Sequence, residues 1–518
     1  MNNSERLATG DACFFYSENE FGVYQGAGVA FYDGPLDYNR VVREINGKLD
    51  RLPRLRQQAV PVPFHIAHPT WEFDPDFDIH NHIVHVELES PGTNEQVLDL
   101  ARELAEDFIP RDRPLWKLFI VNGLEHGRSA TINVVHHALS DGSGMLAYAE
   151  VMSDFEPNLV HGEPAVRMFP PIPSAGTRFV RAIRDDILNV GRILAKAPVR
   201  LALVPRTICS RRFWTGWRIM ARYLTAPTVK MPYNTHLTGK RAYSWTMVAM
   251  EDIQAIRHTL HGTVNDIFLT IVAGAIERYA HKHGIRTEGK NCLIQAPVDV
   301  RPPGFEDALG NHVATMSICV PFGISDPVER LRMMNKRTME AKEAKLGYGM
   351  HIFLETWRNG VTPPFARWIR LAFHAPLSQR IIHKLKPRPS LHVCASNVAG
   401  PAEPIYLAGR ECIMQIPLGL VVHGCGFFGN AFSYNGQFYF GAATDKETAP
   451  DAEAFVEFMI EGYEELMHAG GIVRHGPAPT ISPLPPAPEK RVHTNGTSKR
   501  HLDISPSMLK TEKPGHPE

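Results

Sequence analysis

Residues 131–143 read Thr-Ile-Asn-Val-Val-His-His-Ala-Leu-Ser-Asp-Gly-Ser. β-Branched side chains predominate as far as Val135, and such residues favour an extended strand. Asp141 and Gly142 then interrupt the strand, and helix-favouring residues follow from Met145 to Met152. The pattern therefore places two histidines at a strand-to-helix corner, where α/β proteins commonly locate their chemistry.

The paired histidines allow three interpretations. A metal site formed by His136, His137 and Asp141 is disfavoured, because strand geometry splays the two rings and no Cys cluster or Glu-x-x-His completes a ligand set. Two core histidines followed by a capping aspartate are the plainest alternative. We favour a general base, since an imidazole with an ordinary pKa near ~6.5 can accept a proton at neutral pH. Because successive strand side chains point to opposite faces, only one histidine can be that base.

Length and composition limit the possible classes of protein. The chain has 518 residues with 44% hydrophobic content, enough for a large core and two or more domains. Basic and acidic residues balance at 55 each, so nucleic acid is not expected as a partner. The 7 cysteines are widely spaced without a Cys-x-x-Cys pair, which predicts reduced thiols in a cytoplasmic protein, without a zinc site. No basic segment followed by an apolar run opens the chain, so no secretory signal is expected.

Residues 412–444 carry no formal charge, which raises the question of a membrane span. Pro417 and several glycines interrupt this stretch, and the aromatic run after Gln437 is typical of a strand. We therefore interpret the stretch as buried sheet.

The remaining pattern predicts alternating helices and strands. Helical spacing begins after a capping Asp37 and again after Thr93, where Gln96 occupies the capping-box position. Residues 117–121 and 129–137 predict a hairpin. Further helices are predicted at 253–258, at 264–280 and after Asp326. Further strands are predicted at 292–300, 314–321 and 392–398. The aromatic stretch 11–32 is expected to enter a sheet at the mouth of the site.

The second half of the chain repeats the order of the first, which predicts an α/β fold with two similar halves. We expect residues 1–175 to form the first half, 176–240 a basic connector and 241–470 the second half. The tail at 471–518 is rich in Pro, Ser, Thr and Lys and is expected to be disordered.

Several motifs resemble those of known acyltransferases. His136 to Gly142 matches the HHxxxDG signature of the CoA-dependent acyltransferase superfamily, which includes chloramphenicol acetyltransferase and the condensation domains of peptide synthetases. Over about residues 8–468 the chain is similar to the bacterial wax ester synthase/diacylglycerol acyltransferase family. The motifs shared with that family are Pro114-Leu115-Trp116, Asn265-Asp266, Pro-Val-Asp-Val-Arg at 297–301, Gly310-Asn311 and Ser-Asn-Val-Ala-Gly-Pro at 396–401. Asp299 and Ala399 depart from the family pattern, which bears on acceptor selectivity more than on reaction class.

The resemblance implies transfer of a fatty acyl group from acyl-CoA to a long-chain alcohol or to diacylglycerol. It also implies two chloramphenicol-acetyltransferase-like halves with mixed sheets and a tunnel between them. Acyl-CoA would be a co-substrate, and no other cofactor and no metal are expected. A base without an adjacent Cys or Ser nucleophile indicates direct attack by the acceptor hydroxyl on the thioester.

Site residues follow partly from the same resemblance and partly from their positions at strand and helix ends. His137, the second histidine of the motif, would be the base, and His136 would act through folding or positioning. Asn265, in the first turn of a helix, would help to hold negative charge on the thioester oxygen, unless it is an ordinary helix-start residue. Asp141 is expected to pair with Arg301, and Gly142 and Asp266 complete the supporting set.

Two stretches contain no acidic residue, and they bear on localisation. Between Asp186 and Glu251, and again between Glu355 and Glu403, basic residues alternate with aliphatic and aromatic ones. A solvated basic helix pair and a membrane-facing surface both fit the first stretch. A patch for the phosphates of CoA would use only a few of these residues. We expect a cytoplasmic protein that is peripheral on a membrane or on lipid inclusions.

Two alternatives to this function remain. The first is another HHxxxDG enzyme, such as one that condenses carrier-bound acyl groups. The second is a non-catalytic protein of lipid surfaces that keeps the fold.

Overall fold

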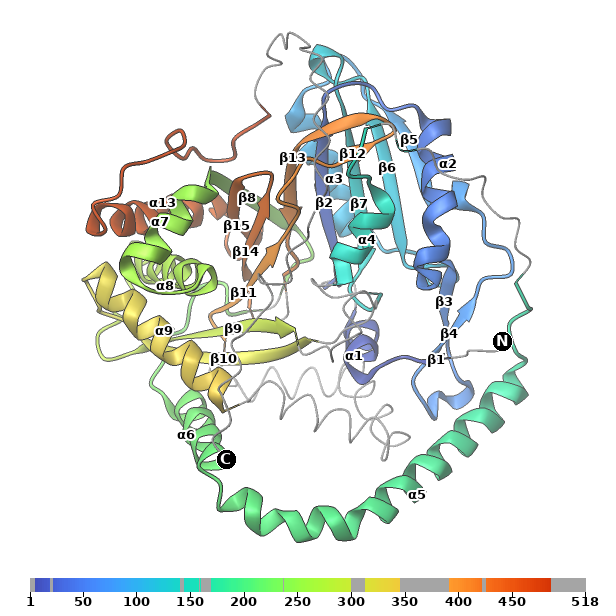
Figure 1. Ribbon diagram of the computed structural model, residues 1–518, viewed down its shortest axis with the longest axis horizontal. Helices are drawn as coiled ribbons and strands as arrows, with labels where there is room; N and C mark the ends of the chain where they lie inside the picture. The colour runs from blue at the N-terminus through green and yellow to red at the C-terminus, as the bar shows by residue number, and fades with distance from the viewer. Residues whose placement is uncertain are drawn as a thin grey trace, which may run out of the picture. The chain divides into compact units, whose positions relative to one another are not determined.

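The computed structural model describes residues 5–18, 22–139, 144–157, 159, 169–235, 237–299, 313–344, 391–421 and 425–485. Two six-stranded sheets and a small three-stranded sheet form the framework of this part of the chain (Figure 1). The small sheet consists of β1 (Glu5–Arg6), β4 (Thr70–Phe73) and β3 (Gln57–Val60), and it contributes Trp71 to the first hydrophobic core.

The first large sheet is mixed and contains the strand that leads to the histidines. Its order is β12 (Tyr406–Leu407), β13 (Arg410–Leu418), β2 (Gln25–Tyr32), β7 (Ser129–His136), β6 (Trp116–Asn122) and β5 (Ile83–Glu87). The strand β5 runs parallel to β6, whereas β7 runs antiparallel to both of its neighbours. Because β7 lies between two strands and is covered on both faces, its β-branched residues are buried, and only Asn133 is partly exposed.

The second large sheet is also mixed. Its order is β10 (Val313–Pro321), β9 (Asn291–Asp299), β11 (Val393–Ala399), β14 (Phe427–Tyr434), β15 (Gln437–Asp445) and β8 (Arg241–Ala249). The three strands β9, β11 and β14 are parallel, and the outer pairs are antiparallel. Strands β13, β14 and β15 account for most of the uncharged stretch 412–444, which confirms that this stretch forms sheet.

A late segment of the chain contributes two strands to the first large sheet. Strands β12 and β13 fall within the predicted second half, yet they complete the edge of the first sheet beside β2. The chain then returns to the second sheet as β14. The prediction of two similar halves is confirmed as an architecture, but the halves are not consecutive in sequence.

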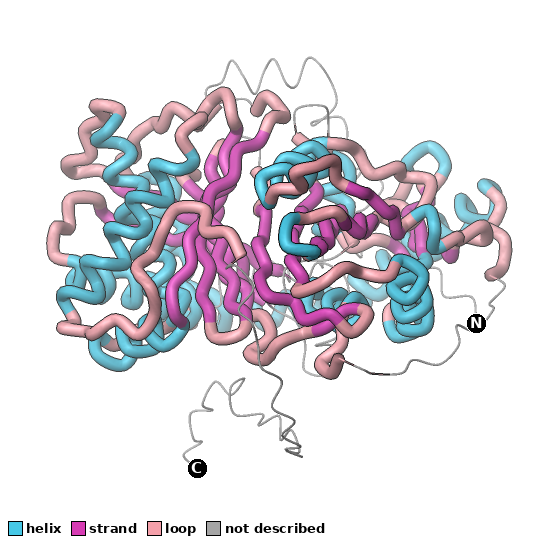
Figure 2. The backbone as a smooth tube through the Cα atoms, turned by 90° about the horizontal axis from the view of Figure 1, so that it is seen from above, coloured by secondary structure: helices cyan, strands magenta, loops and turns pink. Residues whose placement is uncertain are grey.

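Helices cover the sheets, as the cyan and magenta segments of Figure 2 show. Helix α3 packs on β2 and β7, whereas α8 and α13 pack on the second sheet. The helices of the described residues are α1 (Thr9–Ser17), α2 (Tyr38–Lys48), α3 (Asn94–Glu106), α4 (Gly144–Met152), α5 (Ala175–Ile208), α6 (Arg211–Thr225), α7 (Met250–Leu260), α8 (Val264–Lys282), α9 (Pro327–Glu343) and α13 (Ala452–Ala469).

The predicted helix starts are confirmed where capping residues marked them. Asp37 accepts a hydrogen bond from Arg40 N at the start of α2, and Asp326 accepts one from Val328 N at the start of α9. Thr93 and Gln96 form the reciprocal bonds of a capping box at the start of α3.

Two expectations are wrong or incomplete. The aromatic stretch 11–32 does enter the sheet as β2, but it begins with a helix, α1, that the sequence did not indicate. The tail is not disordered over 471–485: Thr246 Oγ1 donates to Thr480 O at 2.8 Å, and Ser482 N donates to Trp245 O at 2.6 Å. Residues 486–518 lie outside the described residues, and so do residues 345–390, which include most of the second acid-free stretch between Glu355 and Glu403.

Within the described ranges, no single helix is both long and apolar enough to cross a membrane. The helices α7 and α8 reach that length and apolarity only when taken together, and their axes bend by 95° where they meet.

Candidate active site

Strand β7 brings both histidines to one end of the first sheet. The side chain of His136 is 1% exposed and lies edge-on to Phe15. Its Nδ1 accepts a hydrogen bond of 3.0 Å from the backbone N–H of Ala138, so the proton of the neutral ring belongs on Nε2. That Nε2 lies 3.4 Å from Glu18 Oε1. Both ring nitrogens of His136 therefore face protein atoms.

His137 follows directly after the strand and is partly exposed. Its ring stacks on Phe14 of α1, with the centroids 4.3 Å apart and the planes at 24°. Its backbone N–H donates to the carbonyl oxygen of Tyr24 at 2.8 Å, and Leu139 N–H closes the turn onto the carbonyl oxygen of His136 at 2.9 Å. The backbone of His137 is thus held in place while the residue remains accessible.

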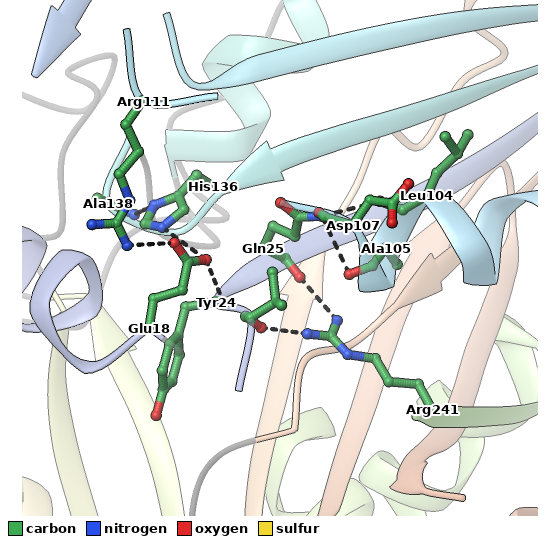
Figure 3. Close-up of polar contacts among 11 residues, drawn as sticks. Glu18, Tyr24, Gln25, Leu104, Ala105, Asp107, Arg111, His136, Ala138 and Arg241 are labelled. Atoms are coloured by element: carbon green, nitrogen blue, oxygen red, sulfur yellow. Dashed lines mark hydrogen bonds and ion pairs between the residues drawn. The ribbon is translucent and has the colours of Figure 1, made fainter. Parts of the chain in front are cut away.

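Glu18 lies beside His136, although no sequence pattern distinguished it (Figure 3). Its side chain is 1% exposed. Its Oε2 accepts from Arg111 Nη2 at 2.7 Å, and its Oε1 accepts from Tyr24 N at 3.1 Å. Burial alone would raise the pKa of this carboxyl, but the neighbouring His136 and Arg111 lower the pKa to about 2. Glu18 is therefore an anion at any pH at which a histidine acts as a base.

A second polar cluster joins the two sheets next to this network. Arg241 of β8 donates to the carbonyl oxygens of Val23 and Gln25, the latter at 3.1 Å. The amide of Gln25 donates to backbone carbonyls at the end of α3, including that of Leu104 at 3.0 Å. Figure 3 shows both sets of contacts on the segment that leads into β2. The second sheet thus holds the segment to which the backbone of His137 is bonded.

The predicted pair at the start of α8 divides into two different roles. Asp266 is buried and accepts from Thr263 N at 3.0 Å, from Asn335 Nδ2 at 2.8 Å and from Thr338 Oγ1 at 2.6 Å. These bonds cap α8 and join it to α9. Asn265 is partly exposed, and its amide has no hydrogen-bond partner among the described residues.

The remaining predicted residues, Asp141, Gly142 and Arg301, lie outside the described residues, so the Asp141–Arg301 pair stays a prediction. Within the described part of the chain, no group of three or more His, Cys, Asp or Glu is arranged to hold a metal ion.

Comparison with known families follows the same two-part organisation. Residues 7–268 match the wax ester synthase/diacylglycerol acyltransferase catalytic domain, and residues 309–467 match the C-terminal domain of the same family. The chain belongs to this family. As a member of this family, the protein is an acyl-CoA-dependent acyltransferase.

Individual relatives agree with this membership. Two Mycobacterium tuberculosis proteins, both provisionally named diacylglycerol O-acyltransferases, are 27% identical to the chain. One matches over 89% of this chain and 90% of its own length, and the other over 81% and 86%.

Solved structures of this family and of condensation domains share the fold. The wax ester synthase/diacylglycerol acyltransferase from Marinobacter aquaeolei VT8 has a TM-score of 0.57 at 19% identity, covering 90% of this chain and 100% of that one. A mutant starter condensation domain of rhizomide synthetase, in complex with C8-CoA, has a TM-score of 0.56 at 11% identity, covering 91% and 96%. Both neighbours show the expected two-half α/β architecture, so the predicted fold class is confirmed.

Proposed function

We propose that the protein transfers a fatty acyl group from acyl-CoA to the hydroxyl of a long-chain alcohol or of diacylglycerol, with His137 as the general base. The products are a wax ester or triacylglycerol, and free CoA leaves. The observation that supports this most directly is the difference between the two histidines. His136 is enclosed with both ring nitrogens facing protein atoms, whereas His137 is partly exposed at the end of β7.

The reaction proceeds by direct attack. The His137 imidazole removes the proton from the acceptor hydroxyl as its oxygen attacks the thioester carbonyl, and the C–S bond then breaks to release the CoA thiolate, which takes up a proton. Among the described residues, no Cys or Ser lies within two positions of His137 to form an acyl-enzyme. We infer that acyl-CoA and the acceptor reach His137 from opposite sides of a tunnel between the two sheets, without a resident cofactor or metal.

Asn265 is proposed to stabilise the negative charge that develops on the thioester oxygen. It lies in the first turn of α8, where the backbone N–H groups and the helix dipole favour an anion. Its amide has no hydrogen-bond partner among the described residues, which leaves it available to a substrate.

The activity is tested by incubating the purified protein with palmitoyl-CoA and, in parallel, with hexadecanol or dioleoylglycerol. We expect CoA release with formation of wax ester or triacylglycerol, and loss of both products in His137→Ala. A protein that needs an acyl group on a carrier protein, and that is inactive with free acyl-CoA, would instead be a condensation-type enzyme. No transfer from either donor would indicate the non-catalytic alternative.

We further propose that α5 and α6 bind an anionic lipid surface, from which the enzyme collects its apolar acceptor. The helix α5 has a row of exposed apolar side chains at spacings of three and four residues, which defines a single face. This row consists of Val180, Ile183, Ile187, Val190 and Leu194. Arg6 anchors the helix through Asp186 at 2.6 Å, and no acidic residue follows until Glu251.

The helix α6 also exposes large apolar side chains. Trp214 and Trp217 are 56% and 61% exposed, whereas Ile219 and Tyr223 on the opposite face are buried. Arg222 joins that buried side to Glu340 of α9 at 3.0 Å. Exposed tryptophans beside basic residues are typical of helices that lie in a membrane interface.

Sedimentation with liposomes tests the lipid surface. A variant with Trp214→Ser, Trp217→Ser and Leu194→Ser should partition less onto liposomes that contain phosphatidylserine than the wild type, and the wild type should bind neutral liposomes more weakly. Met339→Ser on α9 is the control, since Met339 is also exposed. Equal partitioning of all three proteins would refute the proposal, and a change of oligomeric state without a change in partitioning would assign these helices to self-association.

A further inference from the structure

The buried Glu18 carboxylate is connected to the backbone around His137 by several contacts. Glu18 ends α1, and its side chain is almost completely buried. A buried carboxylate is costly unless charges and hydrogen bonds compensate it. Arg111 supplies the charge at 2.7 Å, and the Arg111 guanidinium in turn lies over the ring of Phe15, 4.3 Å from its centroid. The ion pair is therefore part of the packed layer behind the histidines.

Three contacts lead from this carboxylate to His137. First, Oε1 accepts from Tyr24 N, and the carbonyl of the same residue accepts from His137 N at 2.8 Å. Second, Oε1 lies 3.4 Å from Nε2 of His136, the residue on the N-terminal side of His137. Third, Nδ1 of the same His136 ring accepts from Ala138 N at 3.0 Å, on the C-terminal side of His137. The backbone on both sides of His137, and its own N–H, thus depend on one anion.

We propose that Glu18 is the positioning residue for His137: through Tyr24, His136 and Ala138 its carboxylate fixes the backbone from which the His137 imidazole projects. This inference rests on the proposed role of His137 as the base. Glu18 does not touch the substrate in this account. It acts by keeping the imidazole in one place, and misplacement of a catalytic group by about 1 Å can cost roughly 100-fold in rate.

The change Glu18→Gln tests the proposal, because it keeps the size of the side chain and removes the charge. We expect the folded variant to lose roughly 10- to 100-fold in kcat while KM for palmitoyl-CoA stays within about twofold. The matched control is Glu44→Gln. Glu44 is also a buried carboxylate, held by Arg40 at 2.7 Å, that accepts from a backbone N–H, that of Ala408, at 3.0 Å. The control should lower the melting temperature without changing kcat per folded molecule.

A folded Glu18→Gln protein with the kcat of the wild type would overturn the proposal, and so would equal losses of kcat in both variants. If Glu18→Gln does not fold, Arg111→Lys provides the same test, because the Arg111 side chain is 41% exposed and its loss is better tolerated. That variant keeps the charge and loses the planar guanidinium that lies over Phe15, so we expect a smaller loss of kcat. An unchanged kcat in Arg111→Lys would then overturn the proposal.

The double variant separates this inference from the proposed function. If Glu18 acts through His137, adding Glu18→Gln to His137→Ala should cause no further loss of the residual rate. If the rate losses of the two single variants multiply in the double variant, the positioning role is contradicted and the proposed function is not affected. A His137→Ala protein that turns over as fast as the wild type would instead refute the proposed function.

Discussion

The histidine at the end of β7 and the one that follows it differ in burial. His136, His82 and His392 are nearly inaccessible, and the ring of each contacts backbone groups of its neighbours. His137 is partly exposed, and its ring stacks on Phe14. An accessible histidine at a strand end can be reached by a substrate, and this is why we propose His137 as the base and His136 as a structural residue.

His392 leads to a prediction about pH. Its Nδ1 accepts from Leu293 N at 3.0 Å and its Nε2 donates to Val229 O at 2.9 Å, so the neutral ring is fully bonded. Burial lowers its pKa to about 4, which is below the value of 6.5 in the unfolded chain. Because the unfolded chain then binds the proton first, stability should fall as the pH drops from 6.5 towards 4, by roughly 1 to 3 kcal/mol from this residue. Urea unfolding of the wild type and of His392→Gln at pH 7 and pH 5 measures this loss of stability. A His392→Gln protein with the same pH dependence as the wild type would contradict the assignment.

At the residue scale, the sequence predicted the two histidines because they occur as a motif next to each other. Glu18 could not be predicted in this way, since its partners Arg111 and His136 are about a hundred residues away and only the fold brings them together. Glu20 stands only two positions away, so the sequence alone gives no reason to single out Glu18.

Among the elements, α8 combines a folding function and a proposed catalytic one in adjacent residues. Asp266→Ala would remove the acceptor of Asn335 Nδ2, one of the two acceptors of the buried Thr338 Oγ1 and the cap of α8, so we expect it to lower the free energy of unfolding by roughly 2 to 4 kcal/mol. Asn265→Ala should leave stability nearly unchanged and lower kcat by roughly 10- to 100-fold. Thermal unfolding and steady-state kinetics on both variants distinguish the roles. An Asn265→Ala protein with full activity would make Asn265 an ordinary helix-start residue.

The elements that sequence predicted well are those with a local signal. Helices α2, α3 and α9 begin at side-chain caps, and β7 contains a run of mostly β-branched residues. Helix α1 has no side-chain cap and is apolar or aromatic along most of its length, so it lacks the alternation that marks an amphipathic helix. Its residues Ala12, Phe15 and Tyr16 belong to the first hydrophobic core, and we attribute its helical state to this packing, which local sequence patterns do not report.

On the scale of the whole molecule, the exchange of β12 and β13 makes the two sheets interdependent. Residues 1–240 alone would lack β13 and would expose the edge of β2 along the register that pairs Ile416 with Val29. Exposed strand edges promote aggregation. We therefore expect fragment 1–240 to be aggregated when expressed alone and to become soluble when co-expressed with 241–518. Size-exclusion chromatography checks this, and a monomeric fragment 1–240 that unfolds cooperatively would contradict it.

The segment 471–485 also connects distant parts of the molecule, which composition alone did not predict. His475 donates from its backbone N to the buried Asp252 at 2.8 Å, and Trp245 Nε1 donates to Pro483 O at 3.2 Å. A proline-rich composition indicates a lack of regular structure, but it does not exclude an extended segment whose polar groups bond to a neighbouring strand. A chain ending at residue 471 should therefore melt at a lower temperature than one ending at residue 485, and equal melting temperatures would show that these contacts contribute nothing.

The role of His137 is tested most directly by measuring kcat and melting temperature for His137→Ala and His136→Ala side by side, with palmitoyl-CoA and the preferred acceptor. We predict that His137→Ala keeps the melting temperature of the wild type within a few degrees and loses roughly 100- to 10,000-fold in kcat, the usual contribution of a general base. His136→Ala should lower the melting temperature, because it removes a buried ring that bonds Ala138 and contacts Glu18. A folded His137→Ala protein that retains most of its activity, while a folded His136→Ala protein loses it, would contradict the account.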